Sequence, residues 1–501
     1  MKLCAALFFL AIAGTSAWAE IRFEDRASGL PEHVYLGGWE HFVGGGVAVF
    51  DCNNDGLLDL YAAGGEAAAR LMVNQGDFEF ETARSPEITA VTGAYPIDID
   101  GDRVLDLFVL RVGPNIALRG LGDCAFEDAT EDWGLPTRDA WTTAFTAWWA
   151  PGETRPTLVV GNYVDRSDPG GPFGTCDTHE ILRPGGAGYS AESLGPGYCT
   201  LSILAAQDAS GQHRLRISND RHYYLRGGHE QMYDIATNRF LGPEDGWEQV
   251  SLWGMGIASR DITGDGRDEV MLTSMGDQLM QIAQDDGTYR AAPFDLGTYA
   301  QRPHVGEDGR PSTGWHAEFG DVDNDGRADL FIAKGNVDQM PGLATRDPNN
   351  LLIQTETGRF EEVSVSAGVA TLARSRGASL ADIDRDGRLD LVVMNRRAPM
   401  EIYRNISTSN PAWLAIELDL PINRFGIGYH LDVSWDGGRE RRQITLGGGH
   451  AGGQIAPVHF GLGTAQDALV RVFDTEGKQI FDGRFTAGQV VRVNQAMQSS
   501  K

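Results

Sequence analysis

Residues 321–329 read DVDNDGRAD and residues 382–390 read DIDRDGRLD, so both follow the spacing D-x-D-x-D-G-x-x-D. Related nine-residue stretches begin at Asp51 (DCNNDGLLD), Asp98 (DIDGDRVLD) and Asp261 (DITGDGRDE). Each stretch stands between two short apolar runs. An acidic loop that recurs five times in the same surroundings indicates an internal repeat.

The distances between the loops predict further copies that have lost their acidic residues. The five loops start 47, 163, 60 and 61 residues apart, and 163 is close to three ordinary periods. Two apolar runs in this gap, Leu158–Asn162 and Leu215–Asn219, correspond to the run that follows the first loop. Their own loops would start at Trp149 and Ala206 and lack the residues of a cation cage. The sequence therefore predicts seven repeats.

The apolar runs have the character of strands. Gly46–Phe50 precedes the first loop and Leu60–Ala63 follows it, and Gly or Asn bounds such runs, which predicts a hairpin. Ile116–Leu118 and Ala125–Thr130 give the second repeat another pair of strands. Repeats of four short strands are typical of a β-propeller. We therefore expect an all-β fold, a seven-bladed β-propeller followed by a small C-terminal β-sandwich.

The two ends of the repeat region support this arrangement. The seventh repeat stops after Glu401–Asn405 and lacks its fourth strand, while Ile21–Leu30 resembles the missing element. We expect this N-terminal strand to complete the seventh blade and to leave no free sheet edge. From Trp413 to Val493 short alternating runs are separated by Gly-rich turns, which predicts the sandwich. The expected domains are residues 20–409 and 410–495, with a tail at 496–501.

The first nineteen residues resemble a secretory signal. Lys2 is followed by the apolar stretch Leu3–Ala13 and by the small-x-small site Ala17–Ala19. We expect a mature chain that begins at Glu20 and is exported to the periplasm or the extracellular space. No later run reaches the roughly 18 apolar residues of a membrane span.

The charge of the chain narrows the classes of partner. Lys and Arg number 42 against 70 Asp and Glu, a formal net charge of −28. A nucleic-acid binder needs a basic surface, so we expect no nucleic acid partner. A cation and a protein or glycan ligand are the partners that remain.

Four cysteines remain once Cys4 leaves with the signal, an even number that suits disulfides in an exported protein. Cys176 and Cys199 bracket a Gly/Pro-rich stretch and form the first expected pair. Cys52 with Cys124 follows by elimination, although two unpaired buried thiols remain an alternative for these residues.

The acidic loops carry the ligand types of a hard cation. Calcium takes six to eight oxygens, and side chains at positions 1, 3, 5 and 9 of a tight loop can meet at one point. An EF-hand is excluded, because its glutamate at position 12 is replaced by an apolar residue in every copy, such as Ala62 and Ile332. A metal-free, Asx-rich turn is the alternative for any single loop. The expected Ca²⁺ ligands are Asp51, Asn53, Asp55 and Asp59; Asp98, Asp100, Asp102 and Asp106; Asp261, Thr263, Asp265 and Glu269; Asp321, Asp323, Asp325 and Asp329; and Asp382, Asp384, Asp386 and Asp390.

Two of these loops are expected to differ from the rest. Thr263 replaces a carboxylate in the fifth repeat, which predicts weaker binding there. Arg103 stands at the glycine position of the second repeat, which predicts a different turn.

In their strand–loop–strand context these loops resemble the FG-GAP/VCBS repeats of integrin α-subunit propellers. The whole chain resembles the secreted cartilage acidic protein family and its bacterial relatives, in which an ASPIC/UnbV domain follows a seven-bladed propeller. The residues that carry the C-terminal match are Asn410–Leu414, Asn423–Gly428, Gly447–Gly449 and His459–Gly463. A Trp-Pro-x-Gly turn usual in the family is replaced by Phe473–Gly477. The resemblance implies a calcium-binding propeller and no particular reaction.

No catalytic signature such as G-x-S-x-G or H-E-x-x-H occurs in the sequence. Aromatic and polar residues near the inner strands could meet at one mouth of the channel, or simply pack between blades. The stretch 165–200 could cap that mouth.

Adhesion or ligand recognition is the function that we expect, with a polysaccharide hydrolase or lyase and an envelope scaffold as alternatives. A pocket that pairs His41 or His316 with carboxylates would favour the enzyme. The mouth candidates are Trp39–His41, Trp253, Trp315–His316, Asn162–Asp165 and Asn219–Tyr224.

Overall fold

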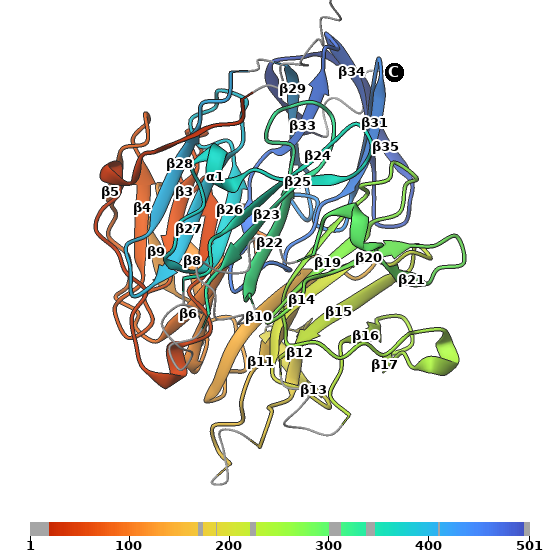
Figure 1. Ribbon diagram of the computed structural model, residues 1–501. Coiled ribbons are helices and arrows are strands. Elements are labelled where there is room, and N and C mark those ends of the chain that lie inside the picture. The colour runs from red at the N-terminus through yellow and green to blue at the C-terminus, as the bar shows by residue number, and fades with distance from the viewer. Residues whose placement is uncertain are drawn as a thin grey trace, which may run out of the picture.

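The structure, a computed structural model, describes residues 20–168, 174–186, 188–220, 227–299, 312–336, 346–408 and 411–494. The expected signal at 1–19 and most of the candidate stretch 219–224 lie outside these residues. Short β-strands dominate the described chain, which confirms the all-β prediction (Figure 1). One short α-helix, α1, spans Ser364–Ala367, and no helix of the described residues is long and apolar enough to cross a membrane.

Most strands form successive antiparallel meanders of four, each beginning with the strand that precedes a hairpin loop. A short pairing between β10 and β7 joins the second and third meanders into one sheet. The strands in chain order are β2 (Val47–Phe50), β3 (Asp59–Ala62), β4 (Arg70–Asn74) and β5 (Phe80–Thr82); β6 (Val91–Ile97), β7 (Asp106–Gly113), β8 (Ile116–Gly120) and β9 (Phe126–Asp128); β10 (Ala140–Trp148), β11 (Thr157–Asn162), β12 (His179–Gly185) and β13 (Gly188–Leu194); β14 (Thr200–Gln207), β15 (His213–Asn219), β16 (Gln231–Asp234) and β17 (Arg239–Phe240); β18 (Gly254–Arg260), β19 (Glu269–Ser274), β20 (Leu279–Ala283) and β21 (Tyr289–Ala291); β22 (Gly314–Gly320), β23 (Asp329–Lys334), β24 (Asn350–Gln354) and β25 (Phe360–Glu362); and β26 (Arg374–Ala381), β27 (Asp390–Arg396) and β28 (Glu401–Asn405). Short 3₁₀ turns lie at Ala27–Gly29, Trp39–His41, Pro243–Asp245 and Phe294–Leu296.

The last of these meanders is completed by the N-terminus, as predicted. Strand β1 (Phe23–Asp25) pairs with β28 in antiparallel register, with Phe23 opposite Asn405 and Asp25 opposite Tyr403. Phe23 is buried among residues of β24, β26 and β27. The strand is thus held by apolar packing as well as by the sheet.

The first strands of the meanders lie against one another in chain order. Strands β2, β6, β10, β14, β18, β22 and β26 each contact the next, and β26 contacts β2. In Figure 1 the orange strands β3 and β4 accordingly lie beside the cyan strands β27 and β28. The series therefore returns to its starting point.

Both expected disulfides are present, Cys52–Cys124 and Cys176–Cys199. The second one encloses β12 and β13, which pair next to β11 and form the outer half of the third meander. The expectation that residues 165–200 cap a channel mouth is therefore wrong for this part of the stretch. Ile181 and Leu182 are both buried, and the backbone of β12 pairs with β11 on one side and with β13 on the other.

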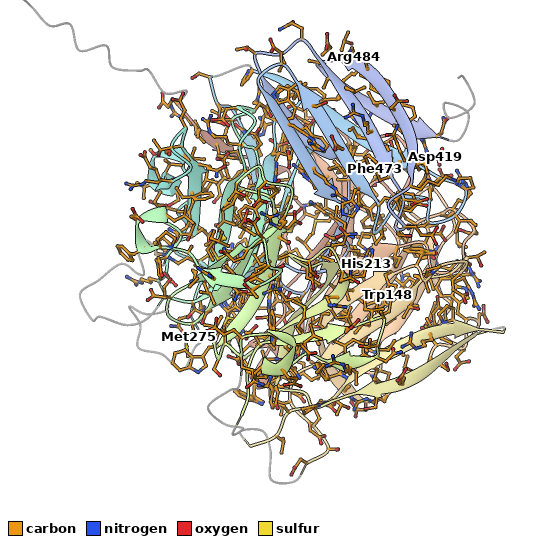
Figure 2. All side chains as sticks on the ribbon, turned by 90° about the vertical axis from the view of Figure 1, so that its right-hand side faces the viewer. Trp148, His213, Met275, Asp419, Phe473 and Arg484 are labelled. Atoms are coloured by element: carbon orange, nitrogen blue, oxygen red, sulfur yellow. A yellow bond between two sulfur atoms is a disulfide. The ribbon has the colours of Figure 1, made fainter. Side chains whose placement is uncertain are left out.

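The C-terminal strands form two sheets that share one hydrophobic core. We refer to residues 412–494 as the C-terminal module. In Figure 2 the labelled Phe473, Asp419 and Arg484 lie above His213 and Trp148 of the meanders. One sheet has the order β33 (Val458–Gly463), β29 (Ala412–Asp419), β36 (Gln489–Asn494), and the other β31 (Gly438–Gln443), β30 (His430–Trp435), β34 (Asp467–Phe473), β35 (Gln479–Thr486). Side chains from both sheets fill the core, among them Leu414, Val433, Phe460 and Val470.

Residues 446–455 of the C-terminal module lie between the first strands of the meanders. We call them the axial segment. The N–H groups of Gly448 and Gly449 donate to the carbonyls of Ile203 (2.8 Å) and Ile257 (2.7 Å). At its end β32 (Gln454–Ile455) pairs in parallel with β2. A Cβ atom at Gly452 would lie 2.3 Å from the Val47 carbonyl oxygen, so glycine is required where the backbones approach this closely.

Replacing Phe23 with alanine tests the role of the N-terminal strand. Loss of a buried aromatic ring lowers the free energy of unfolding by about 3–5 kcal/mol. Glu24→Ala is the matched control, because Glu24 is the exposed neighbour on the same strand and its loss changes stability by less than about 0.5 kcal/mol. Urea unfolding followed by fluorescence measures both values. Equal effects of the two substitutions would show that the strand contributes no apolar packing.

Candidate metal centres

Each acidic loop joins the first strand of a meander to its second strand, as predicted. The loops connect β2 to β3, β6 to β7, β18 to β19, β22 to β23 and β26 to β27. They are numbered here by repeat as the first, second, fifth, sixth and seventh loops. Each loop therefore lies at the same end of its own meander, between the first and the second strand.

The five loops share one turn geometry. The carboxylate at position 1 accepts the N–H of position 6 in every copy, over 2.7–3.1 Å. The carboxylate at position 5 accepts the N–H of position 7, over 2.7–3.0 Å. Positions 4 and 6 both have positive φ, which turns the chain around the carboxylates.

The second loop corrects one expectation from the sequence. Arg103 has φ of 76°, close to the 85–89° of glycine at position 6 of the other loops, so the turn is the same. An arginine in this left-handed region costs about 1–2 kcal/mol. Its guanidinium donates to the carbonyl of Leu420 (2.6 Å) and pairs with Asp419 (2.5 Å). These contacts with the C-terminal module offset the strain.

The carboxylate at position 9 ties the loop to the sheet. Asp390 is fully buried and accepts the N–H of Ile383 at position 2 (2.9 Å) and that of Asn405 on the third strand (2.8 Å). Asp59, Asp106 and Asp329 make the equivalent pair of bonds. A buried carboxylate is stable only with such partners or a cation. Position 9 therefore has a structural role besides the predicted one.

Buried oxygens without a partner mark where a cation fits. Asp51 Oδ1, Asp323 Oδ1, Asp382 Oδ1 and Glu269 Oε1 have no hydrogen-bond partner. Buried acceptors of this kind are rare unless an ion or water satisfies them. A hard divalent cation with oxygen ligands therefore fits these loops.

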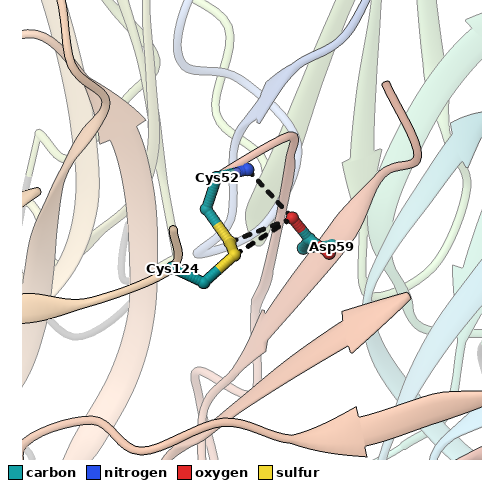
Figure 3. A group of neighbouring side chains, drawn as sticks. All are labelled: Cys52, Asp59 and Cys124. Carbon is teal, nitrogen blue, oxygen red and sulfur yellow. Dashed lines mark hydrogen bonds between the residues drawn. A yellow bond between two sulfur atoms is a disulfide. The ribbon is translucent and has the colours of Figure 1, made fainter. Parts of the chain in front are cut away.

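Three loops bring carboxylate oxygens within 4.8 Å of one another. The sets that can hold a metal ion are Asp98, Asp100 and Asp106; Asp321, Asp323 and Asp325; and Asp382, Asp384 and Asp390. The first and fifth loops have Asn53 and Thr263 at position 3, and no such set of carboxylates is found in them among the described residues. A fourth group, Cys52, Asp59 and Cys124, offers no thiolate, because its sulfur atoms form a disulfide (Figure 3).

Burial makes the ionised state of these carboxylates costly in the absence of metal. It raises the pKa of Asp59 to about 7 and that of Asp106 to about 8, with neighbouring loop carboxylates adding to the effect. The pKa values of Asp321 and Asp390 are raised well above the usual range for the same two reasons. The loops thus need either protons or a cation.

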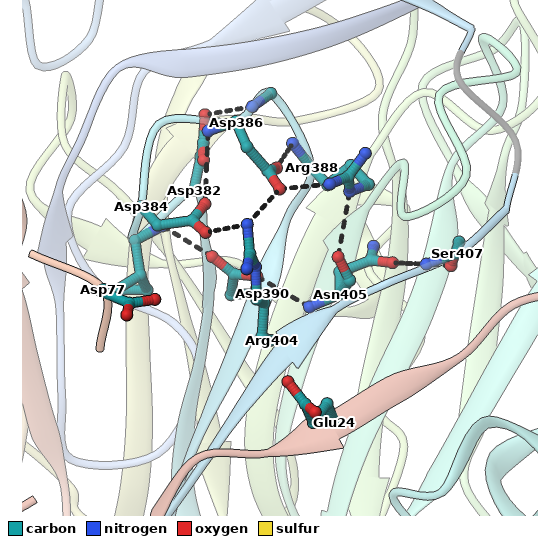
Figure 4. A network of polar contacts seen from close by, with 12 residues as sticks. Glu24, Asp77, Asp382, Asp384, Asp386, Arg388, Asp390, Arg404, Asn405 and Ser407 are labelled. Carbon is teal, nitrogen blue, oxygen red and sulfur yellow. Dashed lines mark hydrogen bonds and ion pairs between the residues drawn. The ribbon is translucent and has the colours of Figure 1, made fainter. Parts of the chain in front are cut away.

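Arginines supply part of the compensating charge. In the seventh loop Arg388, at position 7, pairs with Asp386, and Arg404 on β28 pairs with Asp384 (2.8 Å) (Figure 4). Arg267 and Arg327 pair in the same way with the position-5 carboxylates of the fifth and sixth loops. The arginines leave the orphaned oxygens without a partner.

The sequence analysis missed the amides at the end of the third strands. Asn405 Nδ2 donates to the carbonyl of Leu389 in its own loop (3.1 Å) and to that of Val322 in the preceding loop (2.7 Å). Asn74 links the first loop to Ile383 of the seventh in the same way. The available signal was the asparagine that follows position 9 by 15 residues in both repeats.

Histidine and carboxylate meet at a central cavity of about 220 Å³ between β18, β22, β26 and residues 442–459. His316 Nε2 lies 3.2 Å from Glu318 Oε2, while its Nδ1 accepts the N–H of His450 (3.1 Å). Glu318 also accepts the N–H of Leu380 (3.0 Å) and the amide of Gln454 (2.8 Å). Both ring nitrogens of His316 therefore have a hydrogen-bond partner, and the bond from His450 holds the axial segment in place.

Several of the other mouth candidates pack inside the molecule, whereas Glu40, Asp165 and Trp253 are only partly buried. Trp39 and Trp315 belong to one aromatic cluster with Phe42, Trp141 and Tyr163, in which Trp315 is fully buried. His41 is buried beside them, and burial lowers its pKa. Here the packing interpretation of these residues describes the structure.

Residues 51–109 and 261–332 match the FG-GAP-like repeat family. These stretches contain the first, second, fifth and sixth loops. Over these two stretches the chain resembles FG-GAP-like repeats. It also resembles cartilage acidic protein 1 of Mus musculus (26% identical over 163 residues, 31% of this chain) and of Homo sapiens (26% over 167 residues, 32%). As the matches cover 23% and 24% of those proteins, the chain spans about a quarter of the length of the curated relatives it matches.

One solved structure similar to this chain is that of BBS1N in complex with ARL6DN. It has a TM-score of 0.45 and 12% identity, over 74% of this chain and 94% of that one. A second is YCF48 from Cyanidioschyzon merolae, with a TM-score of 0.41 and 10% identity, over 76% and 98%.

The raised pKa values predict how the effect of metal on stability depends on pH. Without metal, a carboxylate with a raised pKa favours folding while it is protonated, and this contribution is lost as the pH rises from about 4, the pKa in the unfolded chain, to about 6–8. A cation binds only the ionised form. The increase in melting temperature caused by millimolar calcium should therefore grow between about pH 5 and pH 8. Calorimetry in chelator-treated buffers measures it, and an increase that does not vary with pH would contradict this account.

Proposed function

We propose that this chain is an exported calcium-binding β-propeller protein that recognises a protein or glycan ligand. The observation that carries the proposal is the common geometry of the five acidic loops, with buried oxygens that lack a partner in four of them. The side chains at positions 1, 3, 5 and 9 would hold the ions. Calcium supplies positive charge that offsets the repulsion within each loop. Export is supported by two disulfides, which persist in oxidising compartments.

The proposed architecture is a seven-bladed propeller over residues 20–409 and an ASPIC/UnbV-like β-sandwich over residues 410–495. The meanders number seven when the sheet that contains β6–β13 is counted as two, and their first strands contact one another in a closed order. The shared core of the two C-terminal sheets supports the sandwich. The signal at 1–19 completes the proposed division.

The contacts at the central cavity count against the enzyme alternative, although His316 does meet a carboxylate there. A hydrolase or lyase needs a histidine or carboxylate free to move a proton. His316 and Glu318 are paired at the cavity, yet each is saturated by contacts with the axial segment and β26. The envelope scaffold has no separate observation in its favour.

Calorimetric titration of the chelator-treated protein tests the metal proposal. Calcium should bind at the sixth and seventh loops more tightly than at the fifth, because Thr263 supplies a hydroxyl in place of a carboxylate. Asp323→Asn should remove one tight site, and Thr263→Val, which changes no carboxylate, should leave the tight sites intact. A titration without heat, together with a melting temperature unaffected by chelator, would disprove calcium binding.

Ligand recognition is tested on a glycan array and with immobilised extracellular proteins, each probed with and without chelator. The proposal predicts binding that calcium supports. Binding that is indifferent to chelator would separate recognition from the metal sites.

A further inference from the structure

The carboxylates of each acidic loop and the backbone at its tip belong to different positions of the loop. Positions 1, 3, 5 and 9 carry the carboxylates, whereas positions 4 and 6 have positive φ and form the tip of each loop. At the tips stand Asn54 and Asn324 at position 4 and Gly326 and Gly387 at position 6. The tips are therefore shaped by the same turn that gathers the carboxylates.

The tips of the sixth and seventh loops lie against the C-terminal module. His459 Nε2 donates to the carbonyl of Gly387 (3.0 Å), and the N–H of Gly463 donates to that of Asn324 (2.9 Å). The ring of Trp413 covers Gly387 so closely that an added Cβ would lie 1.9 Å from it. Asn324 Nδ2 also donates to the Gly387 carbonyl (2.8 Å), which ties the two tips together.

The first and second loops contact the same module through one arginine. The guanidinium of Arg424 donates to Asn54 Oδ1 (3.1 Å) and to the carbonyl of Arg103. Arg103 in turn reaches Asp419 and the carbonyl of Leu420. Four acidic loops thus share one docking surface, and none of the groups that make these contacts is a predicted calcium ligand.

Among the described residues no such contact is found at the tip of the fifth loop, although Arg260, directly before this loop, pairs with Glu440 of the module (2.9 Å), so the fifth loop is an internal control for the tip contacts. A Cβ atom added at Gly264 or Gly266, its positions 4 and 6, would meet no atom within 4 Å. Its position-5 aspartate has the same partners as that of the sixth loop, although Thr263 replaces the carboxylate at position 3. In both loops the position-5 aspartate accepts the N–H of position 7 and pairs with the arginine there.

We propose that calcium in the first, second, sixth and seventh loops fixes the tips that hold the C-terminal module, and thereby keeps the axial segment between the first strands. The inference rests on the proposed calcium binding. Loss of the ion leaves three or four carboxylates in repulsion at each loop, the positive-φ turn relaxes, and the backbone acceptors at Asn324 and Gly387 leave their donors. The axial segment belongs to the same module and is released with it.

Hydrogen–deuterium exchange of the full-length protein tests this. The N–H groups of Gly448, Gly449 and Gly453 donate to Ile203, Ile257 and Ala94, so their exchange reports the position of the axial segment. Removal of calcium should speed exchange in the peptide that covers 446–455 at least tenfold. The peptide that covers β11, whose hairpin loop carries no acidic cage, should remain protected and shows that the fold persists.

Two matched variants separate docking from metal binding. Asp325→Asn and Asp265→Asn change the same position, remove one carboxylate each and leave the same arginine neighbour. Each should lose calcium at its own loop in a titration. At limiting calcium only Asp325→Asn should speed exchange of the axial segment, because of these two loops only the sixth accepts a hydrogen bond from the C-terminal module at its tip.

The outcomes distinguish this inference from the proposed function. If no calcium binds, both fail. If calcium binds but the axial segment exchanges equally with and without it, or equally fast in both variants, the docking role is wrong and calcium binding stands. If the β11 peptide loses protection together with the axial segment, the metal stabilises the whole fold and no separate docking role exists.

Discussion

The fold depends on the buried aspartate at position 9 of the acidic loops, whose carboxylate needs hydrogen-bond donors or a cation. At position 9 of four loops an aspartate with both oxygens inside the protein accepts one N–H from its own loop and one from the third strand of its sheet. A buried anion with only two neutral donors is poorly stabilised, because desolvation outweighs two ordinary hydrogen bonds. This one requirement connects hairpin, sheet and ion, and it explains why the acidic residues recur with strict spacing.

Neighbouring repeats are coupled through the same place. The amide of Asn74 bridges the first loop to the seventh, and that of Asn405 bridges the seventh loop to the sixth. The first and seventh loops also meet directly, since the guanidinium of Arg385 covers Gly56. The first, sixth and seventh loops are therefore connected, and the C-terminal module contacts all three.

The sequence predicted much of this architecture, because strand periodicity and the acidic spacing are local. The eroded copies at Trp149 and Ala206, the return of Ile21–Leu30 to the last sheet and both disulfides correspond to observed elements. What the sequence could not predict depends on contacts between distant residues. Arg103 keeps a glycine-like turn because its guanidinium finds partners more than 300 residues away. In the sequence, the run Gly447–Gly449 is only part of the C-terminal resemblance, and its role in the axial segment follows from the backbones that it approaches.

The strand shared between the two ends of the chain determines the order in which the molecule can form. Strand β1 is synthesised long before its partner β28 at residues 401–405, and the axial segment that lies among the first strands follows later still. Strand β1 therefore stays without its partner until residues 401–405 have been synthesised, and its contacts with β28 are among the most distant in sequence. The pairing of β1 with β28 must form late and slowly, because the entropy of closing so long a loop is lost before the contacts between the two strands can form.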